Sequence, residues 1–300
     1  MKFGIVGNIN KPKVKSVIRD FVEYLDKVGA DYIFDQELRE FLNLSDDSRI
    51  IPLAKFGNRC DIVVAFGGDG TILSTAAVVG AYGVPIIGVN MGGLGFLAEV
   101  VVEELQETVH NLLEGHYRIL ERMVFAVRLR QKDGKIRQYN ALNDVVVDKG
   151  VGARLILVDV HVDDTYLNTY RSDGIIVSTP TGSTAYSLSA GGPLLVPTMQ
   201  AIIVAPICPH SLTVRPIVLS GDNVLRISVI PGQNPVQINI DGQNRGSLEP
   251  GDLLEIGKAD YTLKWVSTGK RDFFEILRTK LNWGVDLSAL RQKEKNEKHS

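Results

Sequence analysis

Cysteine is scarce in this sequence of 300 residues, because only Cys60 and Cys208 occur. Two thiols cannot form the disulfide framework of a small secreted protein. Both lie in apolar segments, so we expect buried, unreactive thiols. The first residues are strand-like and lack the apolar run and small-residue cleavage site of a signal peptide. These absences together favour a cytoplasmic protein.

The chain also lacks a large net charge and an unbroken apolar run. Its formal charge of −2 provides no overall field that would attract nucleic acid or an anionic membrane. No charged residue lies between Asp69 and Glu99, but glycines and a proline divide that stretch into pieces shorter than the ~20 residues of a membrane span. We therefore expect neither nucleic acid nor membrane as a partner, and any bound anion must be held by local donors.

The first hundred residues alternate between strand-like and helix-like segments. Apolar residues between positions 14 and 28 recur at helical spacing, which predicts an amphipathic helix. The segments 2–7, 31–34, 61–66 and 85–89 are apolar after their first residue, as strands are when both faces of a sheet are covered. This alternation predicts an α/β domain, a parallel sheet with helices on both faces, over residues 1–120.

After residue 120 the hydrophobic period changes to two, and short alternating segments are separated by Gly, Asp and Pro turns. This pattern predicts a β-rich second domain over residues 121–266. Residues 267–300 read as a helix followed by a charged tail, which we expect to pack back on the first domain.

A glycine-rich loop carries the clearest chemical signal. Gly67, Gly68, Asp69, Gly70 and Thr71 follow a predicted strand directly and open a predicted helix. Glycines at such a place let backbone N–H groups approach a phosphate, and the start of the helix adds positive potential. A carboxylate there would repel phosphate unless it accepts a proton from an attacking hydroxyl or holds Mg²⁺. A plain tight turn would also use these residue types.

Better-known phosphate motifs fit this chain poorly. No G-x-x-x-x-G-K-S/T motif is present. Residues 93–98 match G-x-G-x-x-A, but no acidic residue closes a following strand about 20 residues on, as a dinucleotide fingerprint requires. We interpret Asn90, Gly92, Gly93 and Gly95 as a second glycine-rich loop beside the first.

Two further segments suit a nucleoside. The stretch TPTGSTAYSLSAGGP at 179–193 follows RSDG at 171–174 and combines small hydroxyl residues, glycines and one Tyr. Hydroxyls can bind ribose and amide groups, and a ring can pack on a base, although a Ser/Thr-rich loop is the plainer alternative. Asn143 and Asp144 precede a strand, where they could be a turn or a fork for two ribose hydroxyls.

Together and in this order, GGDGT, the LND at 142–144, RSDG, TPTGSTAYSLSAGGP and ICPHSLTVRP at 207–216 resemble the NAD kinase family. The resemblance spans roughly residues 60–245. GGDG is shared with lipid kinases and phosphofructokinases, whereas TPTGSTAYS is far more specific. The resemblance to the family implies the two-domain architecture common to NAD kinases and diacylglycerol kinases. It also implies a phosphotransferase that uses NAD and ATP, or another nucleotide or polyphosphate, and gives NADP.

The resemblance assigns roles to residues. Asp69 matches the base that takes the proton from the 2′-hydroxyl of the adenosine ribose, and the phosphate loop comprises Gly67, Gly68, Gly70 and Thr71. The NAD-binding residues that it implies are Asp69, Gly70, Asn143, Asp144, Arg154, Arg171, Asp173, Thr184, Ala185, Tyr186, Ser187, Leu188, Ser189 and Gln243. Arg154 is matched less securely than the others.

One departure from the family pattern concerns charge. Many members have a basic residue after GGDGT-x-L, where this chain has Ser74, so neutralisation of the donor's phosphates is left unexplained. No spacing of His, Cys or carboxylates indicates a metal held by the protein, and we expect Mg²⁺ to arrive with the nucleotide. His210 lies in a loop that is close to the substrate in the family, but a structural role is equally compatible. The family usually forms homodimers or homotetramers.

Two rival functions are open at this point. A lipid kinase would need an open apolar surface, which the hydroxyl-rich loop disfavours. A non-catalytic NAD-binding regulator would gain nothing from Asp69 beside phosphate. Turnover with NAD and ATP distinguishes all three.

Overall fold

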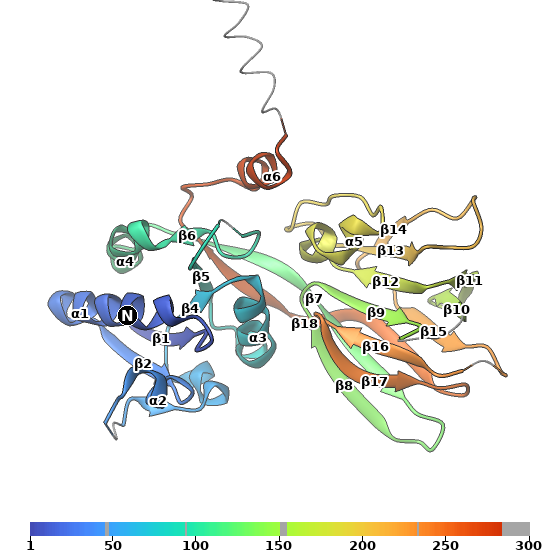
Figure 1. The fold of residues 1–300 in the computed structure, drawn as a ribbon, viewed down its shortest axis with the longest axis horizontal. Coiled ribbons are helices and arrows are strands. Elements are labelled where there is room, and N and C mark those ends of the chain that lie inside the picture. Colours follow the sequence, from blue (N-terminus) through green and yellow to red (C-terminus); the bar gives the residue numbers. More distant parts are fainter. Residues whose placement is uncertain (46–47, 94, 151–154, 233, 284–300) are drawn as a thin grey trace, which may run out of the picture. The chain divides into compact units, whose positions relative to one another are not determined.

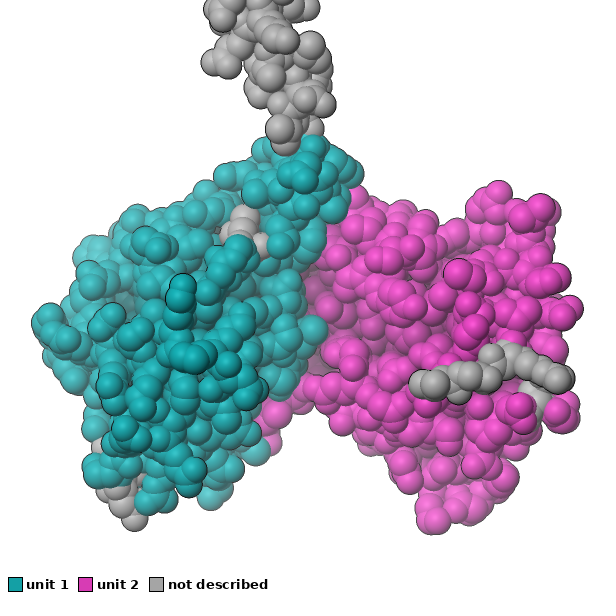
Figure 2. All heavy atoms as spheres, in the orientation of Figure 1, with its two compact units in different colours: residues 1–75, 86–119, 266–300 teal, residues 76–85, 120–265 magenta. Residues whose placement is uncertain are grey.

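The computed structural model describes residues 1–45, 48–93, 95–150, 155–232 and 234–283 (Figure 1). The chain divides into two compact units, coloured separately in Figure 2. Unit 1 comprises residues 1–75, 86–119 and 266–300, and unit 2 comprises residues 76–85 and 120–265. Arg154 lies outside the described residues.

Unit 1 is built on a parallel sheet with the strand order β3-β2-β1-β4-β5, and β6 pairs in parallel with β5. The strands are β1 (Lys2–Gly7), β2 (Asp31–Asp35), β3 (Ile50–Ile51), β4 (Ile62–Gly67), β5 (Ile86–Asn90) and β6 (Val100–Val101). Every residue of β4 and β5 is buried, as the uniformly apolar sequences predict for strands covered on both faces.

Helices complete unit 1. They are α1 (Pro12–Val28), α2 (Leu38–Leu42), the start of α3 (Asp69–Val79), α4 (Leu105–Leu113) and α6 (Phe273–Leu281), with 3₁₀ turns η1 (Leu53–Asn58) and η3 (Val102–Glu104). The amphipathic helix predicted from the spacing is confirmed, because α1 buries Val14, Ile18, Phe21 and Leu25. The helix begins with a proline, and Gly29, with a φ of 69°, caps its end. Before α6, Arg271 makes two 2.8 Å hydrogen bonds to the carboxylate of Glu104.

The strand order places two loops of unit 1 at a ligand-binding position. From β1 the chain passes to β2 on one side, whereas β4 pairs with the other side of β1. The loops after β1 and β4 therefore meet where the strand order reverses, which is where open α/β sheets bind ligands. The backbone N–H of Asn8, just after β1, donates to the carbonyl of Phe66 at 2.9 Å and joins the two strand ends.

Unit 2 consists of two largely antiparallel sheets. One has the order β14-β13-β12-β9-β16-β17, and the other contains β11-β10-β15-β18 with β7 and β8 beyond β18. The strands are β7 (Arg118–Arg130), β8 (Ile136–Ala141), β9 (Asp144–Asp148), β10 (Ile156–Val162), β11 (Thr165–Ser172), β12 (Gly174–Ser178), β13 (Ala201–Ile207), β14 (Ile217–Ser220), β15 (Leu225–Val229), β16 (Val236–Ile240), β17 (Gln243–Leu248) and β18 (Leu253–Ser267).

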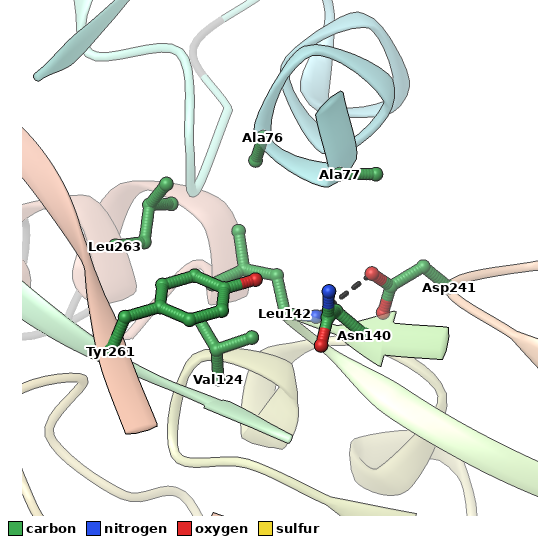
Figure 3. A pocket seen from close by; sticks show the side chains of 8 residues that line it. All are labelled: Ala76, Ala77, Val124, Asn140, Leu142, Asp241, Tyr261 and Leu263. Carbon is green, nitrogen blue, oxygen red and sulfur yellow. Dashed lines mark hydrogen bonds between the residues drawn. The ribbon is translucent and has the colours of Figure 1, made fainter. Parts of the chain in front are cut away.

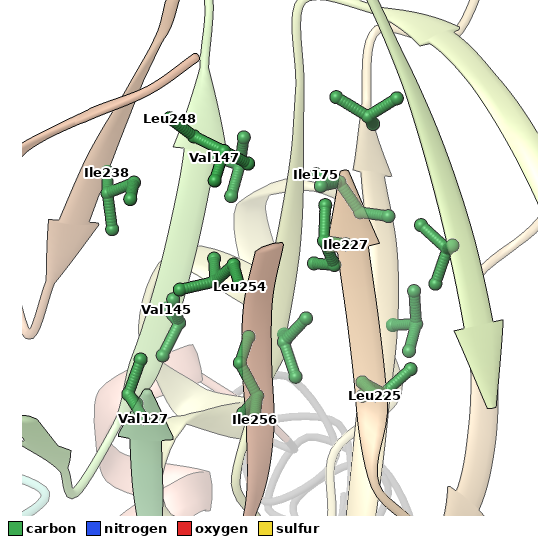
Figure 4. Close-up of a cluster of buried hydrophobic side chains, with 14 of the residues drawn as sticks. Val127, Val145, Val147, Ile175, Leu225, Ile227, Ile238, Leu248, Leu254 and Ile256 are labelled. Atoms are coloured by element: carbon green, nitrogen blue, oxygen red, sulfur yellow. The ribbon is translucent and has the colours of Figure 1, made fainter. Parts of the chain in front are cut away.

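The alternating side chains of both sheets form one core. Val145 and Val147 of β9, in the first sheet, belong to a single cluster of buried apolar side chains (Figure 4). The same cluster contains Leu225 and Ile227 of β15 and Ile256 of β18, in the second sheet. This shared cluster makes unit 2 a β-sandwich, and it accounts for the period of two in the sequence.

A short helical segment covers the outer face of the first sheet. It contains the 3₁₀ turn η4 (Thr181–Thr184) and α5 (Tyr186–Ser189), and a further 3₁₀ turn, η2 (Gly80–Tyr82), lies elsewhere in unit 2. Ile176 of β12 and Ile203 of β13 pack with Ala190 and Leu195 of this covering segment. Strand β12 is consequently buried on both faces, which fixes the 181–195 segment against the end of the sheet.

Two local expectations differ from the structure. Short alternating segments separated by turns are predicted over residues 121–266, but β18 is one continuous strand from Leu253 to Ser267. The 181–189 segment, for which a plain loop was the alternative, contains short helices. Cys208 is exposed, with a φ of 45°, so the prediction of a buried thiol is wrong there. Cys60 is partly buried, and burial raises the pKa of its thiol to about 12. No helix of the described residues is long and apolar enough to cross a membrane.

Candidate active site

The GGDGT loop lies at the junction between β4 and α3 in unit 1. Gly67 ends β4, and α3 begins at Asp69. A Cβ on Gly67 would overlap the side chain of Thr71, so glycine is needed for the helix to start this close to the strand. The carbonyl of Gly68 accepts the N–H of Thr71 at 2.9 Å. The loop therefore places the positive end of a new helix directly after β4, which favours an anion there.

The carboxylate of Asp69 binds to the second glycine-rich loop. Its Oδ1 accepts the backbone N–H groups of Leu97 at 3.1 Å and Ala98 at 3.2 Å, and its Oδ2 accepts that of Phe96 at 3.1 Å. The expectation that the second loop lies beside the first is confirmed by these contacts. A carboxylate has about four lone-pair sites, so Oδ2 keeps acceptor capacity for one further hydroxyl.

A cation that sequence reasoning missed lies against the same loop. Lys11 follows β1, and its Nζ is 3.8 Å from the position that a Cβ on Gly68 would take. Within the described part of the chain no ion pair involves Lys11. Its carbonyl accepts the N–H of Val14 and its own N–H bonds to Asn8, which fixes the turn that carries it. No signal in the sequence marks Lys11, because β1 and β4 are neighbours only in the folded sheet.

The Asn143–Asp144 turn in unit 2 is organised by Asp241. The carboxylate of Asp241 accepts the backbone N–H groups of Leu142 at 2.8 Å, Asn143 at 2.7 Å and Asp144 at 3.1 Å. Asp241 lies in the turn between β16 and β17, with a φ of 48°. Gln243, two residues further on, was a candidate from the sequence, and Asp241 was not. The signal for Asp241 was its position directly after an apolar strand.

Asp144 is a buried carboxyl group with a raised pKa. Its residue is 5% exposed at the start of β9. Burial raises the pKa of Asp144 to about 7, the charge of Asp241 acts in the same direction, and a hydrogen bond from the backbone N–H of Tyr186 opposes both. A carboxyl group that titrates near neutral pH is typical of functional sites.

The 179–189 segment is joined to the same turn. The carbonyl of Asn143 accepts the N–H of Thr179 at 2.9 Å, and a Cβ on Gly182 would overlap that carbonyl. Tyr186 is 48% exposed, so its ring is available to a ligand, whereas Ser187 is fully buried and its Oγ has no partner in the described structure. The structure thus brings Asn143, Asp144 and Tyr186 together, although 42 residues separate Asp144 from Tyr186.

The RSDG residues lie at the end of β11. Asp173 pairs with Lys149, whose Nζ is 2.7 Å from Oδ1, and the N–H of Lys149 donates to the carbonyl of Asp173 at 3.1 Å. Sequence reasoning missed Lys149. Arg171 is exposed in β11, and its carbonyl accepts the N–H of His210 at 2.9 Å. Backbone contact therefore ties the ICPHS segment to RSDG, while the side chain of His210 is exposed.

Gln243 begins β17 and is exposed, and its Oε1 accepts a 2.6 Å hydrogen bond from Arg245. Among the described residues, no hydrogen bond joins the side chain of Gln243 to the Asn143–Asp144 turn. Among those residues there is also no group of three or more His, Cys, Asp or Glu side chains that could hold a metal ion.

A pocket within unit 2 borders the turn (Figure 3). Its space of about 230 Å³ includes open solvent. Figure 3 shows Asp241 and Leu142 on one side and the ring of Tyr261 on another, and the dashed line is the bond from the N–H of Leu142 to Asp241. The remaining walls are mostly apolar: Ala76, Ala77, Val124 and Leu263.

The fold and these residues fit a phosphotransferase with an alcohol acceptor. A glycine-rich loop with one carboxylate lies in the α/β unit, and a hydroxyl-rich segment lies on the β-sandwich.

Comparisons with known proteins agree with this class. The ATP-NAD kinase N-terminal domain model matches residues 3–117, and the ATP-NAD kinase C-terminal domain model matches residues 142–268. The chain is 39% identical to the NAD kinase of Geotalea daltonii over 94% of this chain and 99% of that protein. It is 40% identical to a NAD kinase of Chlorobium phaeobacteroides over 95% of this chain and 98% of that protein.

Solved structures support the fold. Yeast NADH kinase in complex with NADH superposes with a TM-score of 0.87 at 26% identity, covering 95% of this chain and 88% of that chain. A NAD kinase from Archaeoglobus fulgidus in complex with ATP has a TM-score of 0.71 at 24% identity, covering 92% and 98%. The chain belongs to the NAD kinase family, and the predicted α/β and β-rich architecture is confirmed.

Proposed function

We propose that this NAD kinase transfers the terminal phosphoryl group of ATP to the 2′-hydroxyl of the adenosine ribose of NAD, and that Asp69 is the base. The observation that carries this proposal is the position of Asp69 in the phosphate loop, with Oδ2 able to accept one more hydrogen bond. The proton of the attacking hydroxyl passes to this carboxylate as the oxygen forms its bond to phosphorus. The bond between the γ-phosphorus and the bridging oxygen breaks, and ADP leaves with its electron pair.

The donor's phosphates lie at Gly67, Gly68, Gly70 and Thr71 in this proposal. The N–H groups at the start of α3 point to where negative charge gathers during transfer. Lys11 adds the cation that position 74 does not provide, because its Nζ lies against Gly68. Mg²⁺ arrives with the nucleotide and, when bound, neutralises phosphate charge. Because the proposal gives the remaining acceptor site of Asp69 to the hydroxyl, the phosphates of the nucleotide would hold the ion.

Unit 2 supplies most of the NAD-binding residues. Asn143 and Asp144 bind ribose hydroxyls from a turn whose backbone is fixed by Asp241. Residues 184–189 lie on the same side, since the N–H of Tyr186 reaches Asp144. Arg171, Asp173 and Gln243 belong to the NAD-binding set as well. Arg154, outside the described residues, completes it.

The proposal also covers the localisation, the oligomeric state and the phosphoryl donor of the enzyme. We expect it to act in the cytoplasm as a homodimer or homotetramer, with polyphosphate as the alternative donor to ATP. Neither nucleic acid nor a membrane is needed for the reaction.

Turnover is the test of this function. Purified enzyme is incubated with Mg²⁺, ATP or polyphosphate, and either NAD or NADH, because the similar yeast structure is a NADH kinase. Formation of NADP that needs both a donor and Asp69 supports the proposal. Binding of NAD without turnover would identify a regulator instead, and phosphorylation of diacylglycerol in place of NAD would identify a lipid kinase.

A further inference from the structure

We propose that residues 95–98 position the carboxylate of Asp69 for proton transfer, and that Gly95 is a positioning residue for the reaction. The inference rests on the proposed role of Asp69 as the base. The segment follows β5 and lies outside both the GGDGT loop and the proposed NAD-binding residues. The observations that carry it are hydrogen bonds and steric fit within unit 1.

The hydrogen bonds define the orientation of the carboxylate. Three consecutive backbone N–H groups, those of Phe96, Leu97 and Ala98, converge on Asp69 at 3.1–3.2 Å. Two of them bind Oδ1 and one binds Oδ2, so the plane of the carboxylate is fixed and one lone-pair site of Oδ2 is left for a hydroxyl. Bonds from N–H groups to a charged carboxylate are among the stronger hydrogen bonds in proteins.

Two glycines let the segment come this close. A Cβ on Gly95 would overlap Oδ1 of Asp69. On the other side of the segment, a Cβ on Gly88 of β5 would lie 2.9 Å from the carbonyl oxygen of Leu97 and 3.1 Å from the Cα of Ala98. The segment therefore lies between β5 and the carboxylate, and neither Gly88 nor Gly95 has room for a Cβ atom.

The reaction needs this orientation because proton transfer depends on distance and direction. A misplacement of ~1 Å at a reacting group can lower a rate ~10²-fold. An Asp at the end of a loop has free rotation about two side-chain bonds, and the three N–H groups remove that freedom before the substrate arrives. The segment acts through Asp69 and does not itself touch the reacting atoms, so it positions the base.

The decisive variant is Gly95→Ala, and Gly93→Ala is its matched control. Both glycines have φ values outside the left-handed region, so alanine fits the backbone at either position. A Cβ at Gly93 meets nothing within 4 Å, whereas at Gly95 it displaces the carboxylate. We expect Gly95→Ala to lower kcat ~10–100-fold with the Kd of NAD changed less than ~3-fold. Gly93→Ala should keep the wild-type kcat.

A double variant tests whether Gly95 acts through Asp69. In an Asp69→Asn enzyme the base is already lost, so adding Gly95→Ala should lower kcat no further. If Gly95→Ala lowers kcat by the same factor in the wild type and in Asp69→Asn, the positioning role is refuted. It is also refuted if Gly95→Ala has a wild-type kcat while Asp69→Asn is inactive. A near-normal kcat of Asp69→Asn would instead refute the base itself.

Hydrogen exchange tests the contacts independently of activity, including the case in which Gly95→Ala folds poorly. In the wild type the amide protons of Phe96, Leu97 and Ala98 are engaged by Asp69. Asp69→Ala removes the acceptor, and we expect these three amides to exchange at least ~10-fold faster while those of β4 are unchanged. Equal exchange rates in the two proteins would show that the contacts do not hold the segment in solution.

Discussion

Asp144 donates its backbone N–H to Oδ1 of Asp241 at 3.1 Å, which joins a buried residue at the start of β9 to a half-buried one in the turn between β16 and β17. Burial raises the pKa of Asp241, and the N–H groups of residues 142–144 act in the opposite direction. For Asp144, the N–H of Tyr186 is the one described group that favours the charged form. The pair therefore combines a carboxylate that organises the backbone with a carboxyl group that titrates near neutral pH.

The stability of the enzyme should depend on this titration. The pKa of Asp144 is about 7 in the folded chain against 3.8 for an ordinary Asp, so the folded state binds more protons between these values. The free energy of unfolding should fall as pH rises from ~4 to ~7, by up to ~4 kcal/mol, and then level off. Asp144→Asn should weaken this dependence and be the more stable protein at pH 8.

Urea unfolding at pH 5, 6, 7 and 8 measures the effect. Some dependence should persist in Asp144→Asn, because the pKa of Asp241 is raised in the same direction. Identical slopes for the variant and the wild type would contradict the assignment to Asp144.

Binding of NAD should also depend on Asp144. Asp144→Ala removes the fork for ribose hydroxyls and should weaken NAD binding by ~1.5–3 kcal/mol, the range for hydrogen bonds to charged groups. Calorimetry at pH 8 gives the affinity, and a melting curve gives the stability. Asp133→Ala, which changes an exposed turn, serves as the control. Lower stability with unchanged NAD affinity would identify Asp144 as structural.

Replacing Asp69 by a side chain of the same shape should abolish its function as the base. Asp69→Asn keeps the size of the side chain and removes the proton acceptor, so kcat should fall ~10²–10⁴-fold. The affinity for NAD should change much less. Steady-state kinetics with NAD and ATP measures both, and a variant with near-normal kcat would exclude Asp69 from the mechanism.

Lys11 should contribute to the binding of ATP, the phosphoryl donor, and not to the binding of NAD. Lys11→Met removes the charge beside Gly68 and should raise the KM for ATP ~10-fold, equivalent to ~1.4 kcal/mol. Lys13→Met is the matched control, because Lys13 is also exposed and lies two residues further along. An equal effect of both variants would indicate a general effect of charge and no specific contact.

The position of the acceptor hydroxyl can be tested with substrate analogues. If Asp69 deprotonates the adenosine 2′-hydroxyl, 2′-deoxy-NAD should bind but never be phosphorylated. NADP should bind as a product and not act as an acceptor. NMR locates any new phosphate after incubation with ATP and Mg²⁺, and phosphate on the 3′-oxygen or the nicotinamide ribose would refute the proposed acceptor.

The sequence by itself determined the two kinds of architecture and the chemical segments. The spacing of apolar residues along a short stretch of sequence indicates which side chains are buried. Helix α1 and the strands β4 and β5 could therefore be predicted. GGDGT and TPTGSTAYS could be found for the same reason, since each is a continuous stretch of chain. The period of two predicted short strands, but β18 runs for 15 residues because its neighbours on the sheet supply hydrogen-bond partners along it.

Only the tertiary structure decided which residues meet. Asp69 binds N–H groups 27–29 residues away, and Asp241 binds N–H groups 97–99 residues away. Backbone donors carry no residue-specific mark in a sequence, so neither contact could be predicted. Lys11 reaches Gly68 because β1 and β4 are adjacent strands, and Asp144 acquires its raised pKa from burial that the sandwich creates. Pairing and burial are properties of the folded chain, and for that reason the geometry of the site was left to the tertiary structure.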